Sequence, residues 1–322
     1  MSNILALSSN RWISLWIFIE ITTYLFLTYS IDQIESKNKF EFLLTYFLVR
    51  FISSAIFLIS IFIQLENSLN ILRNNLNAEK IGIAQFRLLS MAFLLKIGSI
   101  PFHPWVFSVI ENLKWKTIAV LTTIQKIIPI WALTFFRNIF LLTFVIIISL
   151  TIIIFIPLKV KRVYYFIATS ATNNIIWIFM SILARPATVL VYSAIYFILT
   201  INLIHNFKKN NIKILNQNIY SRAIVISLFS IIGIPPLLGF IPKLNTIISV
   251  IITREIIVFV LIFIVISNSI TTIIYIKPII TPLTLRLKNI NNKNIILKKN
   301  YLLTNTIHIG WPIIIPIASL IN

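Results

Sequence analysis

Runs of about 20 apolar residues recur along the whole of the 322-residue chain, and no other feature constrains its fold as strongly. A helix of that length crosses a hydrocarbon layer about 30 Å thick. The mean hydropathy is +0.96, and charged residues make up 11% of the chain, against roughly 25% in soluble domains. The five glycines are too few for the turns of an all-β fold. We therefore predict an all-α polytopic membrane protein with a single membrane domain.

Ten segments of the sequence are predicted to span the membrane. They cover residues 12–31, 42–64, 81–110, 117–136, 139–157, 164–184, 187–206, 223–253, 256–276 and 304–321. Two of them, 81–110 and 223–253, are too long for one straight crossing and contain prolines near their centres. We expect helix breaks at these prolines, which are Pro101, Pro104, Pro235 and Pro236. Inside a bilayer such breaks are tolerated only against protein or a water-filled cavity.

Basic residues divide unequally between the two sides of this predicted topology. Of the 28 Lys and Arg residues, 17 fall in the loops after the odd-numbered segments, 6 lie on the opposite side, and 5 lie inside segments. The positive-inside rule predicts such an excess on the inner side of a membrane. Both termini are therefore expected on the outer side, and the polar, basic stretch 277–303 on the inner side. The net charge of +20 gives affinity for anionic lipid, whereas no basic patch with interleaved aromatic residues suggests nucleic acid.

Four charged residues are predicted to lie at membrane depth. Glu20 and Lys126 are near the centres of their segments, and Lys96 and Lys243 flank the two proline breaks. A charge at the bilayer centre costs at least about 2.5–3.5 kcal/mol, so each is a candidate functional residue. A lysine beside a broken helix in each half of the chain is typical of transporter sites between structural repeats. Because burial and nearby carboxylates shift proton affinity, these residues could form a proton relay.

Several polar residues near these charges have both a structural and a functional interpretation. Lys96 and Arg87 could extend their charged ends to the membrane interface, and Arg50 could be a structurally paired residue. His103 either binds backbone groups freed by the break or belongs to the relay. Asn174, in "TSATNNIIWIF", either holds relay water or links helices.

Enzymatic sites of the familiar kinds are not predicted in this chain. The sequence has no glycine-rich phosphate loop, its three histidines are scattered, and it has no cysteine. These facts argue against a nucleotide site, a paired-histidine metal site and iron–sulfur ligation. We therefore expect neither a cofactor nor a metal bound by this chain.

Three stretches of the sequence carry a resemblance to a known family. "LLKIGSIPFHPW", "TTIQKIIPI" and "GIPPLLGFIPK" resemble signature stretches of the chain 2 family of mitochondrial NADH–ubiquinone oxidoreductase, an antiporter-like membrane-arm subunit of respiratory complex I. "LSSNRWISLWIFIE" resembles the stretch that leads to the family's membrane glutamate, and "LKVKRVYYFIATSATNNIIW" resembles its basic loop and following helix. The resemblance covers nearly the whole chain, in order and with fitting spacing.

The resemblance implies two inverted five-helix repeats, related to those of Mrp-type antiporters. The first would cover residues 11–136 and the second 137–276, followed by a basic loop at 277–303 and a last helix at 304–321. Because the chain starts at "MSNILALSSN", about where the family's first helix ends, we expect the first repeat to lack its opening helix. A neighbouring subunit or lipid would take its place.

The resemblance also implies a function and a role for each buried charge. Glu20 would modulate Lys96, Lys126 would be the central lysine, and Lys243 the lysine of the second broken helix. The family commonly has a histidine near Asn174, and because asparagine cannot carry a proton, water held there would substitute.

The implied setting is a proton-translocating complex in the mitochondrial inner membrane. Other membrane-arm subunits, including a neighbouring antiporter-like one, and anionic lipids would be the partners. FMN, iron–sulfur clusters and ubiquinone are expected to bind to other subunits of the complex. The basic loops of this chain are expected to lie in the matrix. The alternatives are an Mrp-like cation/proton antiporter and a structural complex I subunit with a degenerate proton path.

Overall fold

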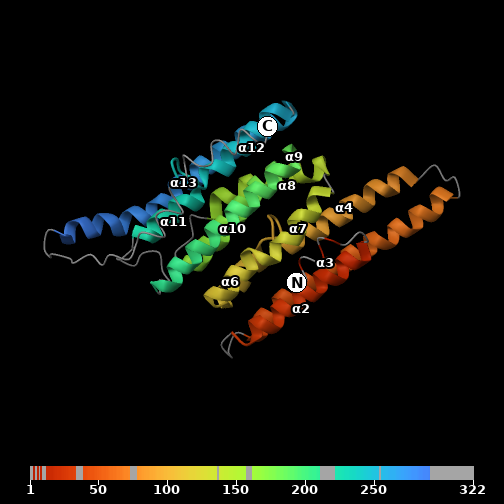
Figure 1. Cartoon of the computed structure of the whole chain (residues 1–322), viewed down its shortest axis with the longest axis horizontal. Coiled ribbons are helices and arrows are strands. Elements are labelled where there is room, and N and C mark those ends of the chain that lie inside the picture. Colours follow the sequence, from red (N-terminus) through yellow and green to blue (C-terminus); the bar gives the residue numbers. More distant parts are fainter. Residues whose placement is uncertain are drawn as a thin grey trace. The chain divides into compact units, whose positions relative to one another are not determined.

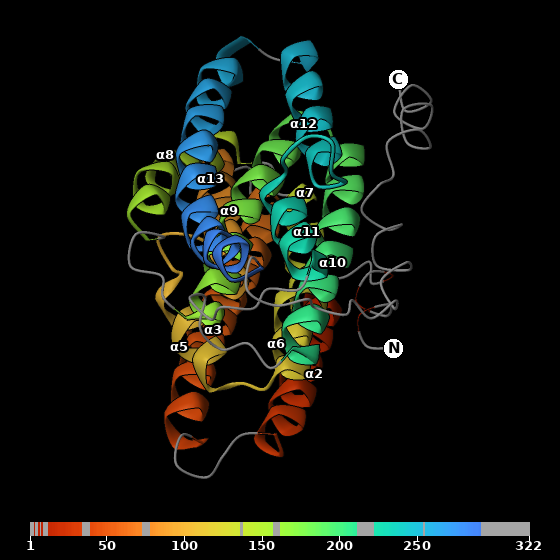
Figure 2. The ribbon, with the colours of Figure 1, turned by 90° about the vertical axis from the view of Figure 1, so that its left-hand side faces the viewer.

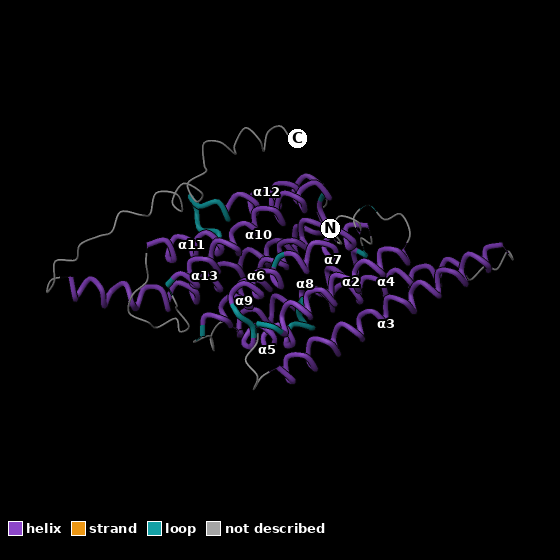
Figure 3. Tube along the Cα trace, turned by 60° about the horizontal axis from the view of Figure 1, so that its bottom comes forward, coloured by secondary structure: helices purple, strands orange, loops and turns teal. Residues whose placement is uncertain are grey.

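The computed structural model describes residues 3, 6, 8, 12–33, 39–72, 78–135, 138–156, 162–210, 222–253 and 255–290. In these ranges every regular element is a helix, as Figure 3 shows. The chain divides into two compact units, Met1–Val145 and Ile146–Asn322. The prediction of an all-α chain is therefore confirmed.

Five helical stretches are long and apolar enough to cross a membrane. They are Trp12–Ile31, Phe40–Leu65, Trp115–Phe135, Val163–Ala184 and Pro186–Lys209. Shorter apolar helices lie in the predicted segments 139–157, 223–253 and 256–276. The predicted segment 81–110 contains the helices Ala78–Ile97 and Pro104–Asn112, and the segment 304–321 lies outside the described residues. Most Ser and Thr side chains in these helices bond back to the preceding turn, as Thr22 does to the Ile19 carbonyl at 2.7 Å. Such hydroxyls need no other partner in an apolar layer.

The first unit is built on a long helical hairpin. Helices α3 (Lys39–Leu72) and α4 (Ala78–Ile97) lie side by side (Figure 1), and α2 (Trp12–Ile31) contacts α3. The short α5 (Pro104–Asn112) packs against α3, while α7 (Ile124–Phe135) packs against α2, α4 and α6 (Trp115–Thr122). Residues from α2, α3, α4 and α7 are thereby gathered in one unit.

The second unit is built around α9 (Val163–Ala184), which is buried along nearly its entire length. Small residues such as Ala168, Ser170 and Ala171 let neighbouring helices approach it closely. It contacts α10 (Pro186–Lys209), α12 (Phe240–Thr253) and α13 (Glu255–Ile290), and α10 lies beside α11 (Arg222–Ile232) and α12 (Figure 2). Helix α8 (Ile139–Phe155) begins in the first unit and ends in the second.

The two predicted breaks have the same backbone pattern. Gly98 (φ 70°) directly follows Ile97, the last residue of α4, and Gly233 (φ 82°) directly follows Ile232, the last residue of α11. The Gly98 amide donates to the Leu94 carbonyl at 3.1 Å and the Ser99 amide to the same carbonyl at 3.3 Å. After α11 the corresponding pair, Gly233 and Ile234, donates to Phe229 at 3.0 and 3.3 Å. This left-handed glycine termination satisfies carbonyls that would otherwise be left without donors.

The prolines thus lie in the interruptions but do not end the preceding helices. Pro101, Pro235 and Pro236 follow the terminating glycine, and cis peptide bonds precede Pro101 and Pro236. Pro104 is the first residue of α5, a position that needs no amide hydrogen. The helices are thus interrupted where the prolines predicted, while the left-handed residues found at these breaks in the described ranges are Gly98 and Gly233.

Two further elements differ from the predicted segments. The segment 117–136 is interrupted at Thr123, between α6 and α7, and Pro129 lies inside α7. Helix α13 continues through Ile290, so the first part of the stretch 277–303 is helical and the rest lies outside the described residues.

Candidate functional site

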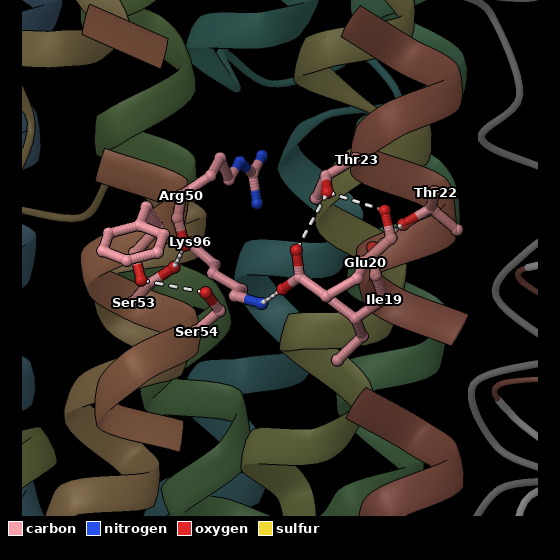
Figure 4. A network of polar contacts seen from close by, with 9 residues as sticks. Ile19, Glu20, Thr22, Thr23, Arg50, Ser53, Ser54 and Lys96 are labelled. Atoms are coloured by element: carbon pink, nitrogen blue, oxygen red, sulfur yellow. Dashed lines mark hydrogen bonds and ion pairs between the residues drawn. The ribbon is translucent and has the colours of Figure 1, made fainter. Parts of the chain in front are cut away.

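An ion pair at the centre of the first unit joins two of the predicted relay residues. The Lys96 amine on α4 lies 3.0 Å from the Glu20 carboxylate on α2, as Figure 4 shows. The Lys96 side chain is 0% exposed and that of Glu20 17%. The Thr23 hydroxyl donates to the Glu20 backbone carbonyl at 2.8 Å and lies 3.4 Å from the second carboxylate oxygen. Because Lys96 is fully buried, it does not extend to the membrane interface.

A cavity of about 300 Å³ opens beside this pair, between α2 and α3. Glu20 and Arg50 are its charged residues, and most of its other lining is aromatic or aliphatic. The buried Arg50 guanidinium lies over the rings of Tyr46, at 5.1 Å, and Trp105, at 5.5 Å. Within the described part of the chain its Nε atom has no hydrogen-bond partner. Arg50 is therefore held by aromatic faces, while Glu20 is paired with Lys96.

Lys126 belongs to the same unit and is also buried. It is the third residue of α7, and its amide donates to the Thr123 carbonyl at 3.0 Å. The neighbouring Gln125 fixes α7 to α2, because its side-chain nitrogen donates to the Thr22 carbonyl at 3.1 Å. The fold thus brings three of the four predicted relay residues into one unit.

Lys243, the fourth, is buried in the second unit and is bound by neutral oxygens. Its amine donates to the Ile232 carbonyl at 2.6 Å and to the Asn268 side-chain oxygen at 2.9 Å. The Trp177 ring centroid lies 5.3 Å away. Ile232 ends α11, so its carbonyl is freed by the helix interruption. A side chain on Gly233 would meet the Lys243 carbon chain at 3.0 Å.

Asn268 on α13 was not among the predicted site residues. Its side-chain oxygen accepts from Lys243 and also, at 3.4 Å, from Asn173 on α9. The available signal was an amide in the apolar stretch "IVISNSIT" of α13. Asn173 and Asn268 together connect α9 and α13 to the lysine of the broken helix.

Asn174 makes a different set of contacts. Its amide nitrogen donates to the Ser170 carbonyl at 2.9 Å, and its oxygen accepts from the Tyr192 hydroxyl of α10 at 3.1 Å. The bond to Ser170 lies within α9, whereas the bond from Tyr192 links α9 and α10, which is one of the two roles considered for Asn174.

His103 and the prolines lie in the interruptions rather than in the buried clusters. The His103 ring nitrogen Nδ1 lies 3.2 Å from the Pro101 carbonyl, and its ring packs edge-on against Phe107 at 5.5 Å. His103 precedes α5 but its side chain does not cap that helix. Within the described ranges, no three carboxylate or imidazole groups gather as metal ligands would.

Comparison with known proteins places the chain in a family. The family model described as NADH:quinone oxidoreductase/Mrp antiporter, transmembrane, matches residues 9–271. The chain belongs to this family.

Curated members of the NADH:quinone oxidoreductase/Mrp antiporter family match most of the chain. NADH-ubiquinone oxidoreductase chain 2 of Rhipicephalus sanguineus is 30% identical over 88% of this chain and 86% of its own length. The protein of the same name from Lumbricus terrestris is 27% identical over 92% of this chain and 88% of its own. The resemblance noted in the sequence is therefore confirmed.

A solved structure has the same fold. A chain of respiratory complex I from Thermus thermophilus with bound aureothin superposes with a TM-score of 0.72 at 16% identity. The match covers 85% of this chain and 66% of that one. At this identity the likeness establishes the fold alone.

Proposed function

We propose that the chain is a proton-conducting membrane subunit of respiratory complex I, the proton-translocating NADH:ubiquinone oxidoreductase. The carrying observation is the buried Glu20–Lys96 ion pair at the end of a broken helix, in a member of a family that includes chain 2 of this enzyme. Lysine can gain and lose a proton when buried, so pairing with a movable carboxylate provides a means of controlling transfer.

In the proposed relay, Glu20 controls the proton on Lys96, and Lys126 is the next carrier in the first unit. Lys243 carries the proton in the second unit, where its neutral oxygen partners accept hydrogen bonds without adding charge. The chain itself has no redox site in this proposal. FMN, iron–sulfur clusters and ubiquinone are bound by other subunits, and electron transfer there drives the relay.

The proposed architecture has ten spans arranged as two inverted repeats. The shared backbone pattern of the two interruptions supports a repeat. The proposed location is the mitochondrial inner membrane, with the basic loops in the matrix and both termini in the intermembrane space. Other membrane-arm subunits, one of them antiporter-like, and anionic lipids surround the chain.

Replacing the central lysine tests the function. In the assembled complex, Lys126→Met is expected to abolish proton-coupled turnover, because Met fills a similar volume but cannot carry a proton. NADH:ubiquinone turnover and the proton-to-electron ratio would be measured together in proteoliposomes. The matched control is Lys116→Met, at an exposed position of the adjacent α6. A normal proton-to-electron ratio in the Lys126 variant would contradict the proposal and favour a structural subunit.

An Mrp-like cation/proton antiporter is the second candidate, because the family description covers both classes. This function predicts that the purified chain exchanges Na⁺ for protons in liposomes without other subunits. If the purified chain exchanges no Na⁺ for protons in liposomes, while active complex serves as the positive control, the antiporter function is contradicted and the complex I function remains.

A further inference from the structure

Among the residues that the structure describes, Arg50 is the buried charged residue that the proposed relay does not use. Its side chain reaches from α3 into the cavity of about 300 Å³ that Glu20 also lines. Figure 4 shows the Arg50 and Lys96 side chains extending toward α2, and the Glu20 carboxylate extending toward α3 and α4. Arg50 rests on the faces of Tyr46 and Trp105, and its Nε has no acceptor among the described residues.

The depth of Arg50 argues against a lipid headgroup as its partner. Within the apolar span Phe40–Leu65, a rise of 1.5 Å per residue puts Arg50 roughly 15 Å from one end and roughly 22 Å from the other. The guanidinium is buried rather than directed to a surface. Arginine stays protonated in proteins, so burial here leaves a fixed positive charge that favours a carboxylate inside the span.

Glu20 is the acidic residue available for this position. Of the eight acidic residues in the sequence, it is the one that lies inside a predicted span. It lines the same cavity as Arg50 and is paired with Lys96 in this structure. Two cations, one on α3 and one on α4, therefore face one carboxylate.

The Glu20 carboxylate also has room and few restraints. One of its oxygens binds Lys96, and the other is 3.4 Å from the Thr23 hydroxyl, a long hydrogen bond. Its side chain is partly exposed to the cavity, whereas that of Lys96 is not exposed at all. Rotation of the Glu20 side chain is thus less hindered than movement of Lys96.

We propose that Arg50 is the second partner of Glu20, and that the carboxylate moves between Lys96 and Arg50 within the cavity. When Glu20 moves to Arg50, Lys96 loses its counter-ion while the fixed charge of Arg50 remains nearby. The Lys96 ammonium then gives one proton to a neutral acceptor, such as the Lys126 amine or a water molecule. Glu20 stays ionised, and Arg50 takes no part in the proton transfer. Arg50 is accordingly a positioning residue.

The role of this carboxylate movement in proton transfer rests on the proposed function. The movement itself can be tested independently of that function. In the structure of the assembled complex carrying Lys96→Met, Glu20 has lost its partner. We expect its carboxylate within about 3 Å of an Arg50 nitrogen. A carboxylate that stays on Thr23, or turns away from Arg50, would overturn the proposal whether or not the subunit pumps.

Activity of Arg50 variants is the second test, and it applies if the Lys96 variant does not assemble. Arg50→Gln is expected to lower proton-coupled turnover about tenfold, and Arg50→Lys, which keeps the charge, to restore most of it. The control is Arg87→Gln, which removes an exposed arginine of α4. Wild-type turnover and proton-to-electron ratio in Arg50→Gln, beside an inactive Lys126→Met, would overturn the role of Arg50 while leaving the proposed function intact.

Discussion

Lys96 and Lys243 lie beside helix interruptions that are built alike, yet they are bound in opposite ways. Lys96 is two residues before the terminating Gly98, in the last turn of α4, and pairs with the Glu20 carboxylate at 3.0 Å. Lys243 is in the first turn of α12, beyond its interruption, and binds the neutral oxygens of Ile232 and Asn268. One lysine is held by an opposite charge, and the other by hydrogen bonds alone.

The helix dipoles add to this difference. The carbonyl end of α4 favours a cation, whereas the amide end of α12 disfavours one. At the second interruption the freed Ile232 carbonyl, 2.6 Å from the Lys243 amine, offsets that disadvantage. The same kind of helix interruption thus places Lys96 at the carbonyl end of a helix and gives Lys243 a direct hydrogen-bond acceptor. Proton-coupled turnover should therefore depend most on the partner's charge at Lys96 in the first unit, and on hydrogen-bond acceptors at Lys243 in the second unit.

Among the changes that compare these two lysine sites, Glu20→Gln is expected to have the largest effect. It leaves Lys96 and Arg50 without a carboxylate, and breaking a buried ion pair from one side costs about 3–5 kcal/mol. Proton-coupled turnover should fall at least tenfold, and Glu20→Asp should restore part of it. The measurement is proton translocation by the assembled complex, with assembly checked by native gel. Wild-type pumping in the Gln variant would show that Lys96 needs no counter-ion, as Lys243 needs none.

A smaller effect is expected at the second lysine from Asn268→Leu. A hydrogen bond to a charged group contributes about 1.5–3 kcal/mol, and the Ile232 carbonyl would remain. Turnover should fall several-fold, and Asn268→Gln should retain more of it. Ser269→Ala is the control, because this serine is exposed and its hydroxyl donates to the Ile266 carbonyl of its own helix. If the Leu variant lost as much activity as Glu20→Gln, the two sites would not differ as described.

Much of the fold and of the charged cluster could be predicted from the sequence, because both follow from the cost of placing charge in an apolar layer. Glu20, Lys96, Lys126 and Lys243 stand out for that reason. The helix terminations were less predictable: proline is the obvious breaker, but Gly98 and Gly233 adopt the left-handed conformation that ends the helices. The interruption at Thr123 was not predicted, since Pro129 lies further along α7.

Contacts between site residues and partners that are distant in the sequence could not be predicted from the sequence. Asn268 carries no charge, and its link to Lys243 depends on how α12 and α13 pack together. The aromatic faces under Arg50 come from α3 and, through Trp105, from the start of α5. These contacts depend on tertiary packing rather than on local pattern, so residue type alone gave no basis for choosing them.

The smallest effect is expected from Tyr192→Phe, which separates the two roles of Asn174. The change removes the hydroxyl that donates to Asn174 at 3.1 Å. Interhelical hydrogen bonds in membranes average about 0.6 kcal/mol, so the melting temperature of the complex should drop slightly. The proton-to-electron ratio should not change, because a residue that links α9 and α10 carries no proton. Tyr196→Phe is a matched control, one turn away on α10, since the Tyr196 hydroxyl is buried without a hydrogen-bond partner in the described part of the chain. A loss of pumping in Tyr192→Phe, absent from Tyr196→Phe, would instead assign Asn174 to the relay and join it functionally to Lys243.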